Sequence, residues 1–495
     1  MNAILALDQG TTGSTALVIH QDGTVLGRGY REIHQHYPEP GWVEHDPEEL
    51  FTSLVAAGTQ ALAAAGLSAS QVAGIGIDVQ RETVVLWDRT TLRPVHNAIV
   101  WQDRRTAERC RELRAAGRAE WLSERTGLVP DPYFSATKIE WLLRDPDLRR
   151  RAARGELAVG TVESWIVARL TSGRVHVTDH TNASRTLLYG LARRGWDPDL
   201  LALFGVPMEL LPAIVPSSGV VAECDAAAFG AALPIAGLVG DQQAALFGQG
   251  CVTPGSAKVT FGTGAFLLEF TGQELRRSRH GLLTTAACGP AGEPAYAVEG
   301  SLFIAGAAVQ WLRDGLGVIE RASETEAIAR SVPDAGGVHF VPAFAGLGSP
   351  YWDPEARGTI TGITGGTRRA HLVRATLEAM AFGCADLLHA MADDTGVPLG
   401  TLRVDGGAAA NDWLMQFQAG ILGATVERPD VVDTTALGAG ALAGLALGVW
   451  RSVEEFQAGR TYARFVPDRS AAERELARAG WRRAVEASLA WARGR

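Results

Sequence analysis

Three glycine-rich turns and one aspartate are the parts of this sequence that can do chemistry. The aspartate is Asp241, in the window IAGLVGDQQAALFGQG, where a strand-like apolar run ends and a run of small residues typical of a helix begins. The turns lie in ALDQGTT (6–12), VTFGTGAF (259–266) and VDGGAAAN (404–411). Backbone amides in glycine turns can approach phosphates closely, and threonine hydroxyls add donors. Together these features indicate phosphoryl transfer, which needs positioned phosphates and an aligned acceptor oxygen.

Two carboxylates have different roles in this interpretation. Asp241 is the candidate general base that accepts the proton of the attacking hydroxyl; the alternative is a structural aspartate that binds loop amides. Asp8, directly before Gln9-Gly10-Thr11-Thr12, can hold Mg²⁺, directly or through water. Its alternative is an aspartate that caps the turn. This turn is not a Walker loop, because no Gly-Lys-Ser/Thr follows it.

A second polar group, Gln80-Arg81-Glu82, follows the apolar run GIGIDV. Charged residues at the end of a buried α/β strand lie where ligands bind. Arg81 can donate to vicinal hydroxyls and Glu82 can accept from them, although a surface ion pair is an equally open interpretation. Four aromatic residues belong either to the core or to a ligand wall: Trp87, Trp101, Tyr133 and Phe266.

The pattern of elements predicts α/β domains. Residues 3–8, 14–19 and 24–30 read as three consecutive antiparallel strands, and the same hairpin type returns at 257–261 and 265–270. Helical spacing at 49–65 and 372–391 alternates with strand-like runs at 72–79 and 402–405. A further helix is expected from Ser470 to about Ala492.

The length of 495 residues exceeds what one core supports, roughly 250–300 residues. Pro254 and Gly255 break the pattern near GQGCVTPGS, so we expect one domain at 1–247 and a second at 257–495.

Composition narrows the class of partner and compartment. A net charge of −9 disfavours nucleic acid and anionic membranes as partners. We expect a cytoplasmic protein for three reasons. Its five cysteines are scattered, and the N-terminus lacks the features of a signal peptide. Its most apolar segment, 436–450, is shorter than the ~18 residues of a spanning helix. We expect 436–450 to be a buried helix. The basic cluster Arg149, Arg150, Arg151 and Arg154 is interpreted as an exposed helix face.

Ten motifs carry a resemblance to a known family over nearly the whole chain. They are ALDQGTT, YPEPGWVEHD (37–46), QRET (80–83), NAIVWQDRRT (97–106), DPYFSATK (131–138), VTDHTNASRT (177–186), AGLVGDQQAALFGQ (236–249), FGTGAF (261–266), VPAFAGLGSPYWDP (341–354) and VDGGAAANDWLMQ (404–416). The sequence resembles the FGGY carbohydrate kinases of the actin-like ATPase superfamily. QRE, PGWVEHD and GSPYWDP are typical of the members that phosphorylate glycerol.

The resemblance implies two actin-like (ribonuclease H-like) α/β domains with the active site in the cleft between them. It implies ATP and Mg²⁺ as cofactors, glycerol as the small-molecule substrate and a homo-oligomer, dimer or tetramer. Asp241 matches the catalytic base, and Asp8 and Asp241 match the positions associated with Mg²⁺. The residues matching the glycerol site are Arg81, Glu82, Trp101, Tyr133, Asp241, Gln242 and Phe266. Those matching the nucleotide site are Thr11, Thr12, Gly13, Thr15, Thr263, Gly306, Gln310, Gly407 and Asn411.

Two positions and one segment depart from the family pattern. Thr15 replaces an arginine that reaches the nucleotide phosphates, so we expect weaker nucleotide binding than in relatives with arginine. Residues 225–237 contain neither the Gly-Gly-Thr-Arg of members regulated by fructose 1,6-bisphosphate nor the histidine phosphorylated in others, so neither control is expected. Glu163 stands where aspartate is usual, and the sequence offers no reason. Two alternatives stay open: a sister kinase for another polyol or ketose, and an ATPase without an acceptor.

Overall fold

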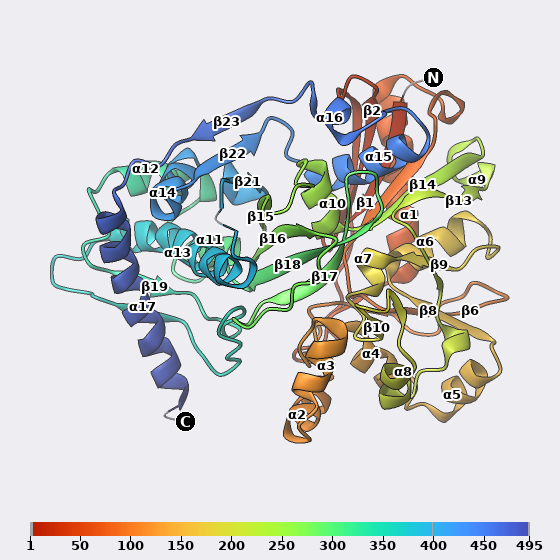
Figure 1. The fold of residues 1–495 in the computed structure, drawn as a ribbon, viewed down its shortest axis with the longest axis horizontal. Helices are drawn as coiled ribbons and strands as arrows, with labels where there is room; N and C mark the ends of the chain where they lie inside the picture. The colour runs from red at the N-terminus through yellow and green to blue at the C-terminus, as the bar shows by residue number, and fades with distance from the viewer. Residues whose placement is uncertain (1–2, 398, 494–495) are drawn as a thin grey trace.

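The fold contains the same sheet topology twice (Figure 1). The computed structural model describes residues 3–397 and 399–493. The first sheet has the order β13-β14-β5-β1-β2-β3 and the second the order β17-β18-β16-β15-β21-β22-β23. In each, a first strand pairs antiparallel with the next strand and parallel with a later one. The expected pair of α/β domains is confirmed, and the repeated hairpin belongs to a repeated topology.

The first sheet comprises β1 (Ala3–Gln9), β2 (Gly13–His20), β3 (Val25–Glu32), β5 (Ile75–Val79), β13 (Ser218–Cys224) and β14 (Leu233–Gly240). The second comprises β15 (Ala257–Phe261), β16 (Ala265–Gly272), β17 (Leu283–Cys288), β18 (Pro294–Leu302), β21 (Thr401–Asp405), β22 (Thr425–Pro429) and β23 (Tyr462–Phe465). The three strands expected at the N-terminus are therefore confirmed, whereas β5 begins three residues later than predicted.

Both faces of the first sheet are buried. Side chains along a strand alternate between the two faces, and each face packs against a different helix. Leu5 and Leu7 pack with α1 (Pro47–Ala65) in one cluster, while Ile4 and Ala6 pack with α15 (Thr434–Ala446) in another. A sheet covered on both faces gives nearly continuous apolar strands. Strand β1 shows this pattern, with residues 3–7 all buried.

Helix α15 comes from the second half of the chain but covers the first sheet. Small residues on both elements allow the backbones of α15 and β5 to approach closely: a Cβ on Gly76 of β5 would lie 2.1 Å from the carbonyl oxygen of Ala439 in α15. The buried helix expected at 436–450 is confirmed in its packing but ends earlier, at Ala446, before Gly448 adopts a positive φ of 72°. The proposed division at residues 247 and 257 stays a prediction.

Helix α10 (Asp241–Gly248) lies between the two sheets. It contacts α15 and β14 on one side and β15, β16 and β17 on the other. Because Asp241 is its first residue, the candidate base lies where the two halves of the molecule meet.

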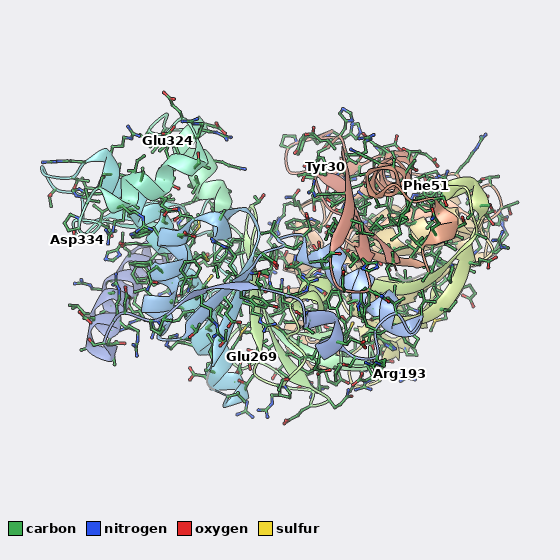
Figure 2. The ribbon with its side chains drawn as sticks, turned by 90° about the horizontal axis from the view of Figure 1, so that it is seen from above. Tyr30, Phe51, Arg193, Glu269, Glu324 and Asp334 are labelled. Carbon is green, nitrogen blue, oxygen red and sulfur yellow. The ribbon has the colours of Figure 1, made fainter. Side chains whose placement is uncertain are left out.

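Helices α13 (Arg369–Thr395) and α14 (Asp412–Leu422) contact the second sheet, with α11 (Gly306–Asp314), α12 (Thr325–Arg330) and α17 (Ala471–Arg493) beyond them. Figure 2 shows two lobes, with Glu324 and Asp334 on one and Tyr30 and Phe51 on the other. Among the described residues, no helix is both long and apolar enough to cross a membrane.

Shorter elements extend the first lobe. The helices are α2 (Ala107–Ala115), α3 (Ala119–Thr126), α4 (Ser135–Leu142), α5 (Pro146–Ala153), α6 (Val162–Leu170), α7 (His180–Ala183), α8 (Pro198–Phe204) and α9 (Ala226–Phe229), and α16 (Val453–Gln457) follows α15. Strand pairs are β4 (Glu44–His45) with β7 (Ala98–Ile99), β6 (Val85–Asp88) with β8 (Leu157–Gly160), β9 (Val177–Asp179) with β12 (Ala213–Val215), β10 (Tyr189–Gly190) with β11 (Gly195–Trp196), and, in the other lobe, β19 (His339–Val341) with β20 (Thr359–Thr361). The basic cluster falls on and just after α5, where Arg150 pairs with Asp147 and Arg151 with Asp88.

Glu163 is a fully buried carboxyl group in the first turn of α6. Its Oε1 accepts hydrogen bonds from the hydroxyls of Thr161 and Thr178, each at 2.6 Å, while Oε2 has no partner among the described residues. Burial raises the pKa of Glu163 to about 7, against the opposing effect of the two hydroxyls. Glutamate, which is longer than the usual aspartate, thus reaches this threonine pair, but its carboxyl group is costly to ionise in the buried site.

We predict that Glu163→Gln stabilises the protein at alkaline pH. Because the folded-state pKa is raised, the folded protein holds a proton that the unfolded chain releases between about pH 4.5 and 7, and wild type loses stability over that window. The variant should unfold with a free energy higher by on the order of 2–3 kcal/mol at pH 8, falling to about 1 kcal/mol or less at pH 5. Urea unfolding followed by tryptophan fluorescence measures both values, and a pH-independent difference would contradict the prediction.

Candidate active site

Three parallel strands of the first sheet end at one edge and deliver the predicted polar groups there. β1 ends at Gln9, β5 at Val79 and β14 at Gly240, and these residues are register partners across the sheet. Asp8 lies next to the end of β1, and Arg81 and Asp241 follow β5 and β14. Ligands bind at such carboxyl ends in α/β sheets.

Arg81 and Glu82 belong to a buried network of four alternating charges. Arg81 donates to both oxygens of Glu299, at 2.6 and 3.2 Å, and Arg185 donates to Glu82 at 2.6 Å and to Glu299 at 2.8 Å. Each of the four residues is at most 2% exposed. The surface ion pair considered as an alternative is therefore wrong.

Sequence reasoning did not assign roles to Arg185 and Glu299. A signal existed, since Arg185 lies in the motif VTDHTNASRT and Glu299 is a charged residue within the apolar strand β18. Burial opposes ionisation of Glu299, but Arg185 and Arg81 hold its pKa below the ordinary value. Burial raises the pKa of Glu82, although both arginines act against this. The network keeps a cationic donor and a carboxylate acceptor side by side.

Three of the four aromatic residues meet beside this network. Trp101 lies edge-on to Tyr133, with ring centroids 5.6 Å apart, and to Phe266 at 6.1 Å. The Tyr133 hydroxyl lies 3.3 Å from Arg81 Nη2, and Phe266 comes from β16 of the second sheet. Trp87 is instead a core residue, 1% exposed.

Asp241 faces this group and is partly open to solvent. Its Oδ1 accepts from the amide of Gln242 at 2.7 Å and lies 3.3 Å from Arg81 Nε, while Oδ2 accepts from the Gln242 side chain at 3.1 Å. Its side chain is 26% exposed, in contrast to the buried charges around it. The carboxylate thus accepts a hydrogen bond from a neighbouring backbone amide, as a structural aspartate would, and it remains accessible for proton transfer.

Asp8 and Asp78 form a carboxyl pair that suits a divalent cation. They are register partners on β1 and β5, and neither oxygen of Asp78 receives a hydrogen bond from a described donor. Burial raises the pKa of Asp8 to about 7, opposed by the hydroxyl of Thr435 and reinforced by Asp241. Within residues 3–397 and 399–493, no three His, Cys, Asp or Glu side chains converge to enclose a metal. Mg²⁺ fits such oxygen donors because it normally keeps water and phosphate ligands.

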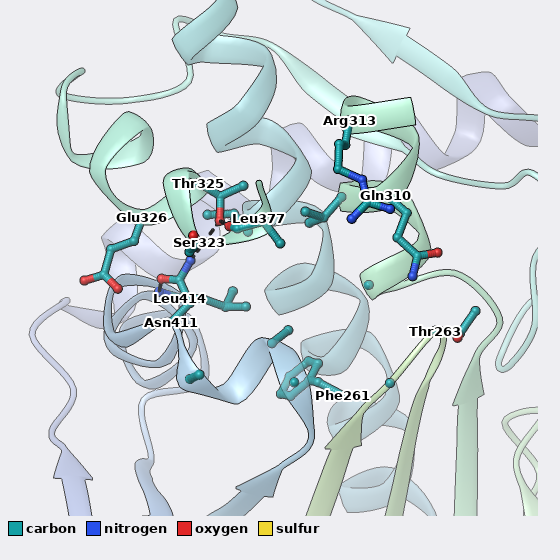
Figure 3. Close-up of a pocket in the computed structure, with 17 residues that line it drawn as sticks. Phe261, Thr263, Gln310, Arg313, Ser323, Thr325, Glu326, Leu377, Asn411 and Leu414 are labelled. Atoms are coloured by element: carbon teal, nitrogen blue, oxygen red, sulfur yellow. Dashed lines mark hydrogen bonds between the residues drawn. The ribbon is translucent and has the colours of Figure 1, made fainter. Parts of the chain in front are cut away.

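A cavity of about 530 Å³ lies between the second sheet and its helices (Figure 3). Five of the residues predicted for the nucleotide line it: Thr263, Gly306, Gln310, Gly407 and Asn411. The structure adds Phe261, Gly262, Ala408 and Ala410 from the two glycine-rich turns, and also Val309, Arg313, Ala322, Ser323, Thr325, Glu326, Leu377 and Leu414, which no sequence motif had singled out for this role.

Glycine is required where the cavity wall is tightest. The amide of Gly306 donates to the carbonyl oxygen of Gly262 at 3.0 Å, and a Cβ on Gly306 would lie 2.6 Å from that oxygen.

Asn411 caps α14 by accepting from the Leu414 amide at 2.9 Å, and its Nδ2 donates to the Thr325 hydroxyl at 3.3 Å.

The other predicted nucleotide residues lie on the first hairpin and do not line this cavity. Thr11 and Thr12 form its turn, Gly13 begins β2, and the Thr11 hydroxyl accepts from Trp101 Nε1 at 2.9 Å. Thr15 is opposite Asp8 in the β1–β2 pair and is 9% exposed.

Comparison with known sequences places the chain in one family. Residues 3–248 match the N-terminal domain of the FGGY family of carbohydrate kinases, and residues 257–447 match its C-terminal domain. A protein of Symbiobacterium thermophilum named glycerol kinase is 54% identical, with 99% of each chain covered. Another with that name from Trichlorobacter lovleyi is 55% identical over 99% of this chain and 100% of its own.

Solved structures give the same result at the level of the fold. The crystal structure of Plasmodium falciparum glycerol kinase with ADP superimposes with a TM-score of 0.92, 35% identity and coverage of 99% of this chain and 98% of that one. A ligand-bound xylulose kinase from Lactobacillus acidophilus reaches a TM-score of 0.87 at 20% identity, covering 99% of both chains, which shows the fold alone. With two actin-like α/β domains and full-length relatives above half identity, this chain belongs to the FGGY family of carbohydrate kinases.

Proposed function

We propose that the protein is an ATP:glycerol 3-phosphotransferase, which transfers the γ-phosphoryl group of MgATP to glycerol and yields sn-glycerol 3-phosphate and ADP. The observation that carries this proposal is the buried Arg81–Glu82 pair between the Asp241 carboxylate and an aromatic wall. The relatives named glycerol kinase, similar over their full length, support it.

Glycerol suits this pocket because it has three hydroxyls and a thin apolar edge. Arg81 would donate to one hydroxyl, Glu82 would accept from its neighbour, and Asp241 and Gln242 would bind the terminal hydroxyl. Trp101, Tyr133 and Phe266 would contact the carbon edge. An analogue that lacks a hydroxyl leaves buried polar groups unpaired, which costs about 1–3 kcal/mol for each group.

Asp241 would take the proton of the attacking hydroxyl as the phosphoryl group is transferred in line. Its partial exposure leaves room for the acceptor, while Arg81 and Gln242 hold both carboxylate oxygens. Movement of the two lobes toward one another would exclude water, which otherwise competes as acceptor.

The two glycine–threonine turns would hold the phosphates from opposite sides. Thr11, Thr12 and Gly13 belong to the first domain and Thr263 to the second, as in the repeated hairpins. Gly306, Gln310, Gly407 and Asn411 would surround the nucleoside end in the cavity. Asp8, through water, and Asp241 would hold Mg²⁺, which supplies neutralisation of phosphate charge when bound.

We also propose that the protein acts in the cytoplasm as a homo-oligomer, a dimer or tetramer. Such assemblies are common in the family that the chain resembles. The scattered cysteines suit a reducing compartment.

We predict that Asp241→Asn strongly lowers the rate of glycerol-dependent ADP release. Loss of a general base typically costs about 10²–10⁴-fold in rate, while glycerol binding should persist because the amide keeps the shape of the side chain. The assay compares MgATP turnover with glycerol, xylulose, ribulose, erythritol and no acceptor, for wild type and variant.

The acceptor panel separates the alternatives. Preferred turnover with xylulose, ribulose or erythritol would identify a sister kinase of the same family. ATP hydrolysis at equal rate without any acceptor would mean that the polyol pocket has been misassigned. Wild-type activity retained in Asp241→Asn would exclude this aspartate as the base.

We predict that Thr15→Arg tightens nucleotide binding. Thr15 pairs with Asp8 across β1 and β2, and a longer cationic side chain at this position would extend toward the phosphates. A hydrogen bond to a charged group contributes about 1.5 kcal/mol, so the dissociation constant of ADP should fall about tenfold. Calorimetric titration of wild type, Thr15→Arg and the uncharged control Thr15→Met with ADP measures this. Equal affinities in the three proteins would show that Thr15 does not weaken the site.

A further inference from the structure

A buried lysine lies behind the site, although none of the steps above uses it. Lys258 is on β15, five residues before Thr263, and is fully buried. Burial lowers the pKa of its ammonium to about 8, while the carboxylates of Asp405 and Asp241 act in the opposite direction. Burying an ammonium group costs free energy unless polar partners compensate it. Its partners therefore show what the residue does.

Hydrogen bonds connect Lys258 to the candidate base across the two domains. Its Nζ donates to Oε1 of Gln242 at 2.6 Å and to the hydroxyl of Thr260 at 2.8 Å. The other end of the same amide, Nε2 of Gln242, donates to Oδ2 of Asp241 at 3.1 Å. Gln242 is only 6% exposed, so solvent has little access to this connection.

The ammonium group determines which way the Gln242 amide points. Lysine has only donors, so an amide next to it must present its oxygen to Lys258 and therefore its NH₂ group to Asp241. Without the ammonium group, only the Asp241 carboxylate holds the amide, so the Gln242 side chain is free to rotate away from it. That rotation would remove the hydrogen bond to Oδ2 and leave Asp241 held only through Oδ1, by the Gln242 amide and Arg81.

We propose that Lys258 is a positioning residue for Asp241 and acts by orienting the side-chain amide of Gln242. The inference rests on the proposed function, because the orientation of Asp241 matters only if this carboxylate takes the proton. It also connects two parts of the site, since β15 continues directly into the turn that carries Thr263. One strand of the second domain thus sets the position of the base, which belongs to the first domain, relative to the phosphate-binding turn.

A purely structural lysine predicts different kinetics. Loss of packing or stability would lower the amount of active enzyme and would do so whatever residue stands at position 241. Loss of positioning changes the rate of the chemical step only while a base is present. Residues that act as one unit have strongly non-additive effects on kcat, which makes the double variant the decisive one.

The experiment compares wild type, Lys258→Met, Asp241→Asn and the double variant, with kcat and the glycerol KM measured for each. Lys258→Met should lower kcat about 10- to 100-fold, because a small displacement of a catalytic group has effects of this size. The glycerol KM should change less than about threefold, because the other contacts to glycerol remain. In the Asp241→Asn background the same substitution should lower kcat by less than about twofold.

Two further variants separate positioning from folding. Lys258→Gln keeps an N–H donor toward Gln242 and should recover most of the lost kcat. Asp386→Asn is the control, because Asp386 is a half-buried group of the second lobe that accepts from Tyr351 and Trp481. It should lower the thermal unfolding temperature at unchanged kcat. If Lys258→Met does not fold, Gln242→Leu breaks the same connection and should lower kcat in wild type but not in Asp241→Asn, while the glycerol KM rises in both backgrounds because Gln242 also contacts the terminal hydroxyl.

The outcomes are distinguishable from failure of the proposed function. Absence of glycerol-dependent turnover in wild type would overturn the proposed function itself. Normal wild-type turnover with an unchanged kcat in Lys258→Met, or an equal loss of kcat in the Asp241→Asn background, would overturn the role of Lys258 and leave the proposed function intact.

Discussion

The candidate site depends on four charges buried together. Arg81, Glu82, Arg185 and Glu299 alternate in sign and are almost entirely removed from water. Burying one such charge alone costs several kcal/mol, whereas removing any one member leaves its partners uncompensated. The network therefore forms only when all four side chains are in place, and they come from distant parts of the chain. Because Glu299 belongs to the second sheet, the proposed polyol pocket can form only when both domains are folded and in contact.

This network also holds a strained backbone in position. Glu82 has a φ of 63°, in the left-handed region that side chains other than glycine rarely adopt. Such a residue costs of order 1–3 kcal/mol and persists only where its surroundings determine it. Here Arg185 binds its carboxylate at 2.6 Å and the Ser135 hydroxyl donates to its carbonyl oxygen at 3.0 Å. This backbone conformation places the Glu82 carboxylate 3.8 Å from Arg81 Nε, just beyond the end of β5.

Charge is separated by sign along the edge of the first sheet. The cationic part surrounds Arg81, whereas the carboxyl pair Asp8–Asp78 lies toward the first glycine–threonine turn. Asp241 lies between the two and interacts electrostatically with both. This arrangement suits a neutral polyol on one side and a cation with its phosphates on the other. The position of α10 between the two sheets makes this possible, and the packing of small residues in α15 holds that helix in place.

The sequence alone determined the elements and the chemical class of the site. Apolar runs, glycine–threonine turns and an aspartate after a strand-like run are local patterns, and the strands and turns that they predict are confirmed. Arg81, Glu82 and Asp241 were recognisable because they directly follow apolar runs that become parallel strands. The tertiary structure alone decided the distant partners: Glu299 for Arg81, Lys258 for Gln242, and α15 for the first sheet. These pairings join residues up to hundreds of positions apart, and local propensity carries no information about which distant charges will share a desolvated site.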